Sequence, residues 1–347
     1  MAEITALGIY FQYWWPNLQS WIPGLITLLV LLGINLISAR VFGNLEFSFA
    51  IIKIVTIIAF VILVFYLLIT NSSTKYGHVS WNNMMIDGGI FAKGPKGFLL
   101  GFQMVIFSFI GVELIGLTAA EAKEPKKTIT RAIDQLPVRI ILFYVLAILS
   151  ILLAIPWTKV STSSSPFVQA LGATGIKNAG SIINFVVISA AISSTNSFIY
   201  SAGRLLFSIN YNGKNKISKH LGKLDHRQLP KNALVFSTVL IALAPLLNLF
   251  LKDAFTFISA TATSMFLLIW SIMIVTHMTY RKKTPKNELP TFRMPLYPIS
   301  DIAVLIFFIA MIIVLLIFPN YRIPMISAGI IFTVLVCLTH FIQKKSN

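Results

Sequence analysis

Charged residues are scarce in this sequence. Only 11% of its 347 residues are Asp, Glu, Lys or Arg, whereas 56% are hydrophobic, and the mean hydropathy is +0.83. A soluble protein of this length needs far more charge to cover its surface. The composition therefore excludes an ordinary soluble domain and predicts an all-α integral membrane protein.

Cysteine and histidine are also rare. The single cysteine, Cys337, lies within an apolar run, so no intramolecular disulfide can form. The five histidines are scattered through loops and helix ends, so we expect no metal site and no cofactor. We also expect no histidine–carboxylate pair within the apolar runs, and this argues against a membrane enzyme.

Acidic residues are few relative to basic ones, which gives a formal net charge of +17. Such an excess can indicate nucleic-acid binding. Most of these basic residues lie between apolar runs, however, and not on one soluble face. An anionic membrane surface and the positive-inside bias explain this pattern more simply. We therefore expect a lipid bilayer as the environment and no nucleic-acid partner.

The beginning of the chain lacks the features of a secretory signal peptide. Residues 1–10 contain no positively charged leader, no long apolar core and no cleavage site. Instead, residues 1–14 have the pattern of a hydrophobic helix entered from its middle. That helix runs up to Trp14–Trp15–Pro16, a pairing typical of the membrane interface.

Apolar runs of about 20 residues, the length that crosses a hydrocarbon core, follow this partial helix. No soluble domain or low-complexity linker separates them, so residues 1–347 are expected to form a single transmembrane domain. We expect nine complete spans near 21–39, 47–70, 97–119, 138–156, 178–207, 233–251, 255–280, 299–318 and 323–342.

Lysine and arginine predict the orientation of these spans. If the chain emerges outside after residue 14, the cytoplasmic segments carry roughly three times as many basic residues as the outer ones. This predicts a multi-pass protein of the cell membrane with a cytoplasmic C-terminus. The outer segment 158–177 forms either a short re-entrant or surface helix, or a plain loop. In the cytoplasmic segment 121–129, Pro125 is expected to end a helix and the mixed charges to form a solvated loop.

The span near 97–119 contains Gly111, Glu113 and Gly116, residues that a lipid environment disfavours. One interpretation is a helix that breaks inside the membrane. Free carbonyls before the break would accept an ammonium group, and the following half-helix would favour an anion. The other is that both glycines allow close helix packing while Glu113 bonds to a neighbour.

Lys53 is the only cation that we place within a span, roughly 10 Å along the helix from Glu46. It either extends back to the interface or carries a proton during transport. Ser189, Ser193, Asn196 and Ser197 share one face of the span near 178–207. They could line a pathway, surround the Lys53 ammonium or pack against another helix. The same alternatives apply to a second polar group, Ser259, Thr261, Thr263 and Ser264.

Several of these segments resemble one family. The stretch 107–140, FSFIGVELIGLTAAEAKEPKKTITRAIDQLPVRI, resembles the sixth-helix signature of the amino acid–polyamine–organocation (APC) superfamily permeases. The resemblance is strongest to bacterial D-serine/D-alanine/glycine transporters. Residues 46–53, EFSFAIIK, are similar to the family's fifth helix, and 165–167 with 182–197 match the region around its eighth.

The resemblance implies an inverted-repeat fold of two five-helix halves plus two extra helices, with the substrate between broken first and sixth helices. Family members have two and a half more helices before Trp14, including the glycine-rich broken first helix. By this comparison the chain is expected to be an N-terminally truncated permease.

The resemblance also implies a function and a site. Phe107 would be an aromatic lid, Ser108 and the Phe109–Ile110–Gly111 backbone would hold the substrate's amino group, and Glu113 would belong to a gate. Lys53 falls where proton-coupled members replace a sodium ion, near Ser189 and Ser193. The implied activity is proton symport of small neutral amino acids such as glycine, D-alanine or D-serine. An exchanger without net proton coupling and a non-transporting remnant are the alternatives, and the oligomeric state stays open.

Overall fold

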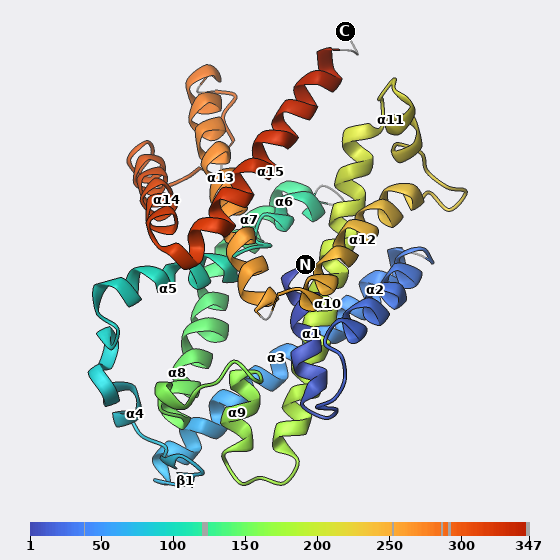
Figure 1. The fold of residues 1–347 in the computed structure, drawn as a ribbon. Coiled ribbons are helices and arrows are strands. Elements are labelled where there is room, and N and C mark those ends of the chain that lie inside the picture. Colours follow the sequence, from blue (N-terminus) through green and yellow to red (C-terminus); the bar gives the residue numbers. More distant parts are fainter. Residues whose placement is uncertain (38, 120–123, 252, 286, 291–292, 345–347) are drawn as a thin grey trace. The chain divides into compact units, whose positions relative to one another are not determined.

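The computed structural model describes residues 1–37, 39–119, 124–251, 253–285, 287–290 and 293–344 (Figure 1). Helices dominate the described residues, and the two short strands pair in an antiparallel hairpin. The elements are α1 (Ala2–Gln12), α2 (Trp21–Asn35), α3 (Ala39–Ile69), β1 (Ser73–Thr74), β2 (Gly77–His78), α4 (Asn82–Met85), the 3₁₀ turn η1 (Ile86–Phe91), α5 (Gly94–Ser108), α6 (Leu114–Ala119), α7 (Pro125–Ile140), the π-turn η2 (Ile141–Val145), α8 (Leu146–Ala154), the 3₁₀ turn η3 (Trp157–Lys159), α9 (Pro166–Gly172), α10 (Ala179–Asn210), α11 (Lys216–Leu221), α12 (Lys231–Leu246), the 3₁₀ turn η4 (Leu247–Leu249), α13 (Ala254–Lys283), α14 (Ile299–Ile317) and α15 (Pro319–Lys344).

Seven helical stretches among the described residues are long and apolar enough to cross a bilayer. Two of the expected spans are not among them. Helix α2 is apolar but has only 15 residues, and the expected span 97–119 is divided between α5 and α6. The seven stretches are Glu46–Ile69, Lys127–Ala154, Ala179–Asn210, Lys231–Leu249, Ala254–Lys283, Ile299–Ile317 and Pro319–Thr339.

The described chain divides into two compact units, which are considered separately. The first unit contains Met1–Ala92 and Leu117–Phe255, and the second contains Lys93–Gly116 and Thr256–Asn347.

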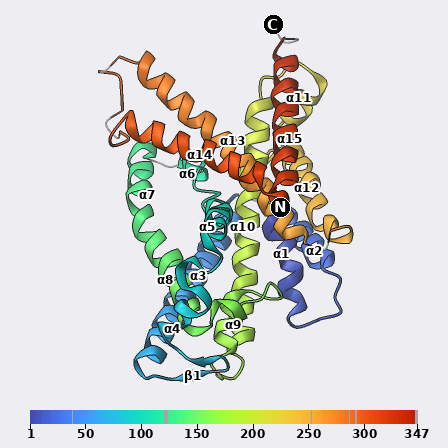
Figure 2. The same cartoon turned by 60° about the vertical axis from the view of Figure 1, so that its left-hand side comes forward.

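Helix α10 is central to the first unit and packs against α1, α3, α9 and α12 (Figures 1 and 2). Small residues let these helices approach closely, as is common where lipid supplies no hydrophobic drive for association. A Cβ atom added at Gly203 of α10 would overlap Leu234 of α12. One added at Gly24 of α2 would lie 3.0 Å from the carbonyl oxygen of Ile4 and 2.9 Å from Pro245.

An apolar cluster joins α3, α8 and α9 within the first unit. Phe60 and Val64 of α3 pack there with Leu153 of α8, and the ring of Phe60 meets the ring of Phe167 edge-on at 5.3 Å. Phe167 belongs to α9, so the segment 158–177 contains a short helix and is not a plain loop. Pro166 suits the first turn of that helix, because its missing N–H would be unpaired there anyway.

The second unit has its own apolar core. Ile106 of α5, Leu267 of α13, Met311 of α14 and Met325 of α15 are buried together. Gln103 of α5 donates a hydrogen bond to Thr263 of α13 at 3.1 Å, and both side chains are fully or almost fully buried. This polar contact fixes the register of α5 against α13 inside an otherwise apolar interface.

The expectation that Pro125 ends a helix was wrong, because Pro125 begins α7. Proline has a fixed φ and no N–H, which suits the first helical turn as well as the residue after a helix. Residues 120–123 of the expected cytoplasmic loop lie outside the described residues. Beyond them, Glu124 and Lys127 form an exposed ion pair at 3.3 Å.

Candidate functional site

The helix break expected at Gly111 is confirmed in the second unit. Helix α5 ends at Ser108, and α6 begins at Leu114. Between them, Gly111 has φ of +108°, a conformation that glycine adopts without steric cost and other residues avoid. The glycine therefore interrupts the α-helical hydrogen-bond ladder at this point.

The backbone at the break forms tight turns and is not extended. The amides of Ile110 and Val112 donate to the carbonyls of Phe107 and Phe109, at 3.1 and 3.2 Å. Each bond closes over three residues, whereas an α-helix closes over four. In the described part of the chain, no backbone amide donates to the carbonyl of Ile110. That oxygen can therefore accept a hydrogen bond from another group.

Glu113 folds back onto the break. Its two carboxylate oxygens accept hydrogen bonds from the Gly111 amide, at 3.0 and 3.1 Å. The carboxylate thus occupies an amide that an external anion would otherwise use. A negative charge beside the free carbonyl of Ile110 favours a cation at this place.

A pocket of about 470 Å³ adjoins the break within the second unit. Phe109 and Glu113 line it together with aromatic residues of α5, α13 and α14, among them Phe102, Trp270 and Phe308. Glu113 is the one ionisable residue among the described residues that line it. The pocket can therefore hold an apolar group close to the carboxylate.

The remaining residues expected at the break have diverse surroundings. Ser108 donates its hydroxyl to the carbonyl of Val105 in its own helix, at 2.7 Å. Phe107 is half-buried next to it. A Cβ atom at Gly116 would meet nothing within 4 Å among the described residues, so no close helix contact there requires a glycine.

Lys53 lies in the first unit, on α3, and its ammonium donates a hydrogen bond to the Ser193 hydroxyl of α10 at 2.9 Å. The side chain of Ser193 is fully buried. Two of the expected residues are therefore brought together. The third, Ser189, donates its hydroxyl to the carbonyl of Val186 in its own helix, at 2.7 Å.

Two further residues surround this contact. The Ser193 hydroxyl donates to Glu46 Oε1 at 2.9 Å. One side of α10 also carries Asn196, whose Oδ1 accepts a bond from the amide of Asn35 on α2 at 2.7 Å. Glu46 Oε2, Asn35 Oδ1 and Asn196 Nδ2 are buried and find no partner among the described residues. This polar cluster can therefore accommodate additional hydrogen bonds.

Sequence reasoning missed the role of Glu46 as a partner of Ser193. Glu46 and Lys53 are seven residues apart, which places them on the same face of α3 two turns apart. That spacing was the available signal. The expectation that Lys53 is the only cation within a span was also wrong, because α10 extends to Asn210 and includes Arg204.

The second polar group, on α13, bonds mainly to its own helix. Ser259, Thr261 and Ser264 donate to carbonyls three or four residues earlier, at 2.8 to 3.0 Å. Thr263 also contacts Gln103. Three of these hydroxyls are thus satisfied within their own helix, and Thr263 joins α13 to α5, which agrees with the helix-packing alternative.

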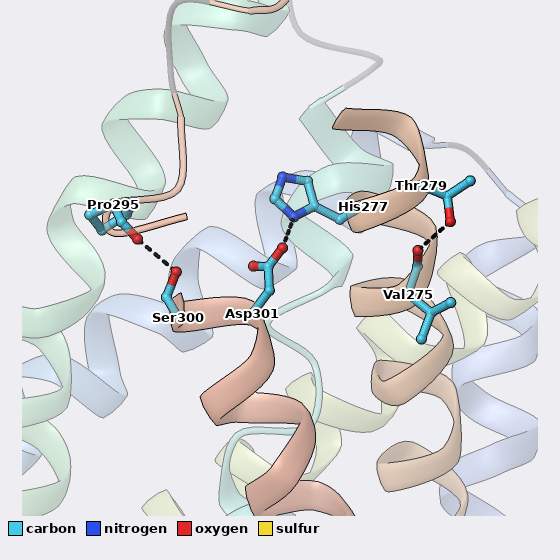
Figure 3. A network of polar contacts seen from close by, with 6 residues as sticks. All are labelled: Val275, His277, Thr279, Pro295, Ser300 and Asp301. Carbon is cyan, nitrogen blue, oxygen red and sulfur yellow. Dashed lines mark hydrogen bonds and ion pairs between the residues drawn. The ribbon is translucent and has the colours of Figure 1, made fainter. Parts of the chain in front are cut away.

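The expectation of no histidine–carboxylate pair was wrong. His277 Nδ1 of α13 lies 2.8 Å from Asp301 Oδ2 of α14, within the second unit (Figure 3). Asp301 is fully buried, and its other oxygen finds no partner among the described residues. The ring of Tyr297 contacts the His277 ring edge-on, with 5.8 Å between the ring centres. The guanidinium of Arg281 lies over the Tyr297 ring, 4.1 Å from its centre. The pair is 24 residues apart and forms only when the two helices fold against each other.

The fold and these two sites define a class of protein. Seven apolar helical stretches among the described residues, a helix interrupted within an apolar segment and a partly buried lysine bonded to a buried serine are the features of a multi-pass membrane transporter. The chain matches the family "Amino acid permease" over residues 1–345. It therefore belongs to the amino acid permease family, whose members are transporters and not enzymes.

Curated relatives agree with this membership. The chain is 40% identical to the uncharacterized transporter YdgF and to the amino-acid permease AapA, both of Bacillus subtilis (strain 168). Each comparison covers 97% of this chain, and 74% and 73% of the respective relatives. It is 35% identical to the D-serine/D-alanine/glycine transporter of Escherichia coli (strain K12), over 99% of this chain and 74% of that protein.

Proposed function

We propose that the chain carries small neutral amino acids, such as glycine, D-alanine or D-serine, across the cell membrane together with protons. Membership of the amino acid permease family supports amino acid transport. The substrate class rests on two relatives, the D-serine/D-alanine/glycine transporter of Escherichia coli and the DL-alanine permease SerP2 of Lactococcus lactis, which is 34% identical. Transport would proceed by alternating access, in which two conformations bind the substrate from opposite sides.

The broken helix is the proposed substrate site. The carbonyl of Ile110 and the carboxylate of Glu113 suit the ammonium group of an amino acid, because the carbonyl accepts no backbone amide among the described residues and the carboxylate, which the Gly111 amide holds beside it, supplies negative charge. Phe107 would cover the substrate, with Ser108, Phe109 and Gly111 around its amino group, and Glu113 would act in the gate. The adjoining apolar pocket suits a small apolar side chain.

The single observation that carries the proton-coupling proposal is the 2.9 Å contact between Lys53 and the buried Ser193. An ammonium in such a site is costly unless it is used, and its charged and neutral forms favour different surroundings. We assign Lys53 as the proton carrier and Ser193 as its partner. Ser189 would contribute less, because its hydroxyl is engaged within α10.

The arrangement in the membrane belongs to the same proposal. The excess of lysine and arginine in alternate connecting segments supports a cytoplasmic C-terminus. We further propose one transmembrane domain of nine spans after the helix at residues 1–14, with helices that follow the inverted-repeat pattern of two five-helix halves plus two extra helices.

The test uses the purified chain in proteoliposomes with radiolabelled glycine or D-alanine. An inward proton gradient should drive uphill accumulation, and Lys53→Met should abolish it, because methionine keeps the side-chain length but cannot bind a proton. Lys75→Met, a change at an exposed residue of the β1–β2 hairpin, is the matched control. Accumulation by Lys53→Met at the wild-type level would refute the role of Lys53. Counterflow without any proton-driven accumulation would indicate an exchanger instead.

A further inference from the structure

Glu46, Ser193 and Lys53 form a continuous hydrogen-bonded chain between α3 and α10. Lys53 Nζ donates to Ser193 Oγ, and Ser193 Oγ donates to Glu46 Oε1, both at 2.9 Å. Lys53 and Glu46 form no direct ion pair in the part of the chain that the structure describes. The buried hydroxyl of Ser193 is therefore the connection between the two ionisable groups.

We infer that Glu46 exchanges a proton with Lys53 through the hydroxyl of Ser193. This inference rests on the proposed proton symport and adds the group that takes the proton from Lys53. Lys53 passes one proton to the Ser193 oxygen while Ser193 passes its own proton to Glu46 Oε1. An ammonium and a carboxylate become an amine and a carboxylic acid, and Ser193 is unchanged.

The surroundings of Glu46 suit both of its states. Glu46 Oε2 is buried and has no partner among the described residues. That oxygen can therefore form one more hydrogen bond. It accepts from water when Glu46 is a carboxylate, and it donates to water when Glu46 is a carboxylic acid. Glu46 also precedes Lys53 by seven residues along α3, toward the end that the basic residues predict to face the cytoplasm.

Few other ionisable groups compete with this route. Among the described elements, α2, α8, α10 and the π-turn η2 make the main contacts with α3. Helices α2 and α8 contain no ionisable residue, and η2 contributes Tyr144. Helix α10 contributes Tyr200 and Arg204, and the Arg204 guanidinium lies 4.7 Å from the centre of the Tyr200 ring. The carboxylate of Glu3 on α1 also acts electrostatically on Lys53. Of these two carboxylates, Glu46 is the one that hydrogen bonds through Ser193 join to Lys53 among the described residues.

The experiment measures two processes with labelled glycine in proteoliposomes, uptake driven by a proton gradient and counterflow without one. Glu46→Gln keeps an acceptor for Ser193 but cannot take a proton. It should lower the rate of gradient-driven uptake by about 100-fold, the lower end of what a positioned proton acceptor contributes, and leave counterflow near wild type. Ser193→Ala should do the same, Ser193→Thr should restore uptake, and Ser201→Ala is the matched control on α10.

A pH profile separates proton exchange from a packing role. In wild type the uptake rate should vary with internal pH, and in Glu46→Gln this dependence should be flat. A simple packing defect would lower uptake and counterflow together at every pH, and that result would overturn the inference, as would wild-type uptake by Glu46→Gln.

Infrared spectroscopy distinguishes failure of this inference from failure of the proposed symport. The carboxylic-acid band that Glu46→Gln removes should also be lost or weakened in Lys53→Met at the same pH, because the acid forms when Lys53 gives its proton through Ser193. Loss of the band in both variants supports the exchange even if wild-type protein shows no gradient-driven uptake. A band unchanged in Lys53→Met, or no band lost in Glu46→Gln, overturns it.

Discussion

Replacing Gly111 by alanine is expected to destabilise the chain, because the backbone at this position has φ of +108°. A side chain with a Cβ atom is strained there, whereas glycine is not. The strain cannot be relieved by continuing α5, because the Gly111 amide would have to leave the carboxylate of Glu113. The substitution therefore forces a choice between a strained break and a lost hydrogen bond.

The size of the effect follows from a comparison with Gly101, which lies in the middle of α5. A Cβ atom at Gly101 would meet nothing within 4 Å among the described residues, so Gly101→Ala should stabilise the helix by up to about 1 kcal/mol. Alanine restricts the unfolded chain equally at both positions, and this contribution cancels between the variants. The remaining difference is the strain at Gly111, about 1–3 kcal/mol for a residue held in a sparsely populated backbone region.

The assay is unfolding in mixed micelles, followed by the fluorescence of the six tryptophans. Wild type, Gly101→Ala and Gly111→Ala are compared at the same protein and detergent concentrations. Gly111→Ala should unfold first and Gly101→Ala last. If Gly111→Ala is as stable as Gly101→Ala, the glycine is not required for the break, and the reasoning from its φ angle is refuted.

Two further predictions concern polar contacts outside the proposed transport site. His277→Ala should destabilise the protein by about 1–3 kcal/mol, because the buried Asp301 carboxylate then loses its hydrogen-bond donor. His277→Asn retains a donor and should destabilise the protein less. Equal stability of the two variants in the same unfolding assay would contradict this prediction. The backbone amides of Leu229 and Arg227 donate to Asp225 and hold the pKa of its carboxyl below the ordinary value. The carboxylate therefore stabilises the loop between α11 and α12 at pH values above its unfolded-state pKa. This stabilisation is lost as the pH falls through the folded-state pKa. Hydrogen–deuterium exchange of residues 222–230, corrected for the intrinsic exchange rate, measures this. Wild-type protein should lose protection on acidification, and Asp225→Ala should show low protection at every pH. Protection that does not change with pH in wild type would disprove the role of Asp225.

Local patterns predicted the parts of the molecule that depend on local physics. Hydropathy located α13 near 255–280, and the helix runs over Ala254–Lys283, because a bilayer requires about 20 apolar residues in one segment. The break was predictable because Gly111 stands beside a carboxylate within an apolar run. Ser193 was expected near Lys53 from the family resemblance and from the polar face of α10.

Hydropathy was a weaker guide to helix ends. The span expected at 138–156 continues a helix that begins at Pro125, because the amphipathic stretch with Arg131 and Asp134 is helical without being apolar. Proline itself marks either boundary of a helix, so the sequence did not decide on which side of Pro125 the helix lies.

Contacts between distant segments could not be predicted from the residues alone; the proximity of Lys53 and Ser193 was expected because the family resemblance implied it. His277 and Asp301 meet because α13 and α14 fold back against each other, and neither residue type nor spacing announces that contact. The bond from Ser193 to Glu46 likewise depends on how far α10 slides along α3. The spacing within α3 places Glu46 on the same face as Lys53, but which residue of α10 lies against that face depends on the packing of the two helices.

The hydroxyl of Ser193 has one proton and lies between a donor, the Lys53 ammonium, and an acceptor, the Glu46 carboxylate. It accepts from Lys53 and gives to Glu46, so the two bonds point the same way along the chain. Once a proton has crossed, both bonds must point the opposite way, and the hydroxyl cannot serve a second proton until the pair is reset. If the inferred exchange takes place, the orientation of this one O–H allows only one proton at a time to pass between Lys53 and Glu46.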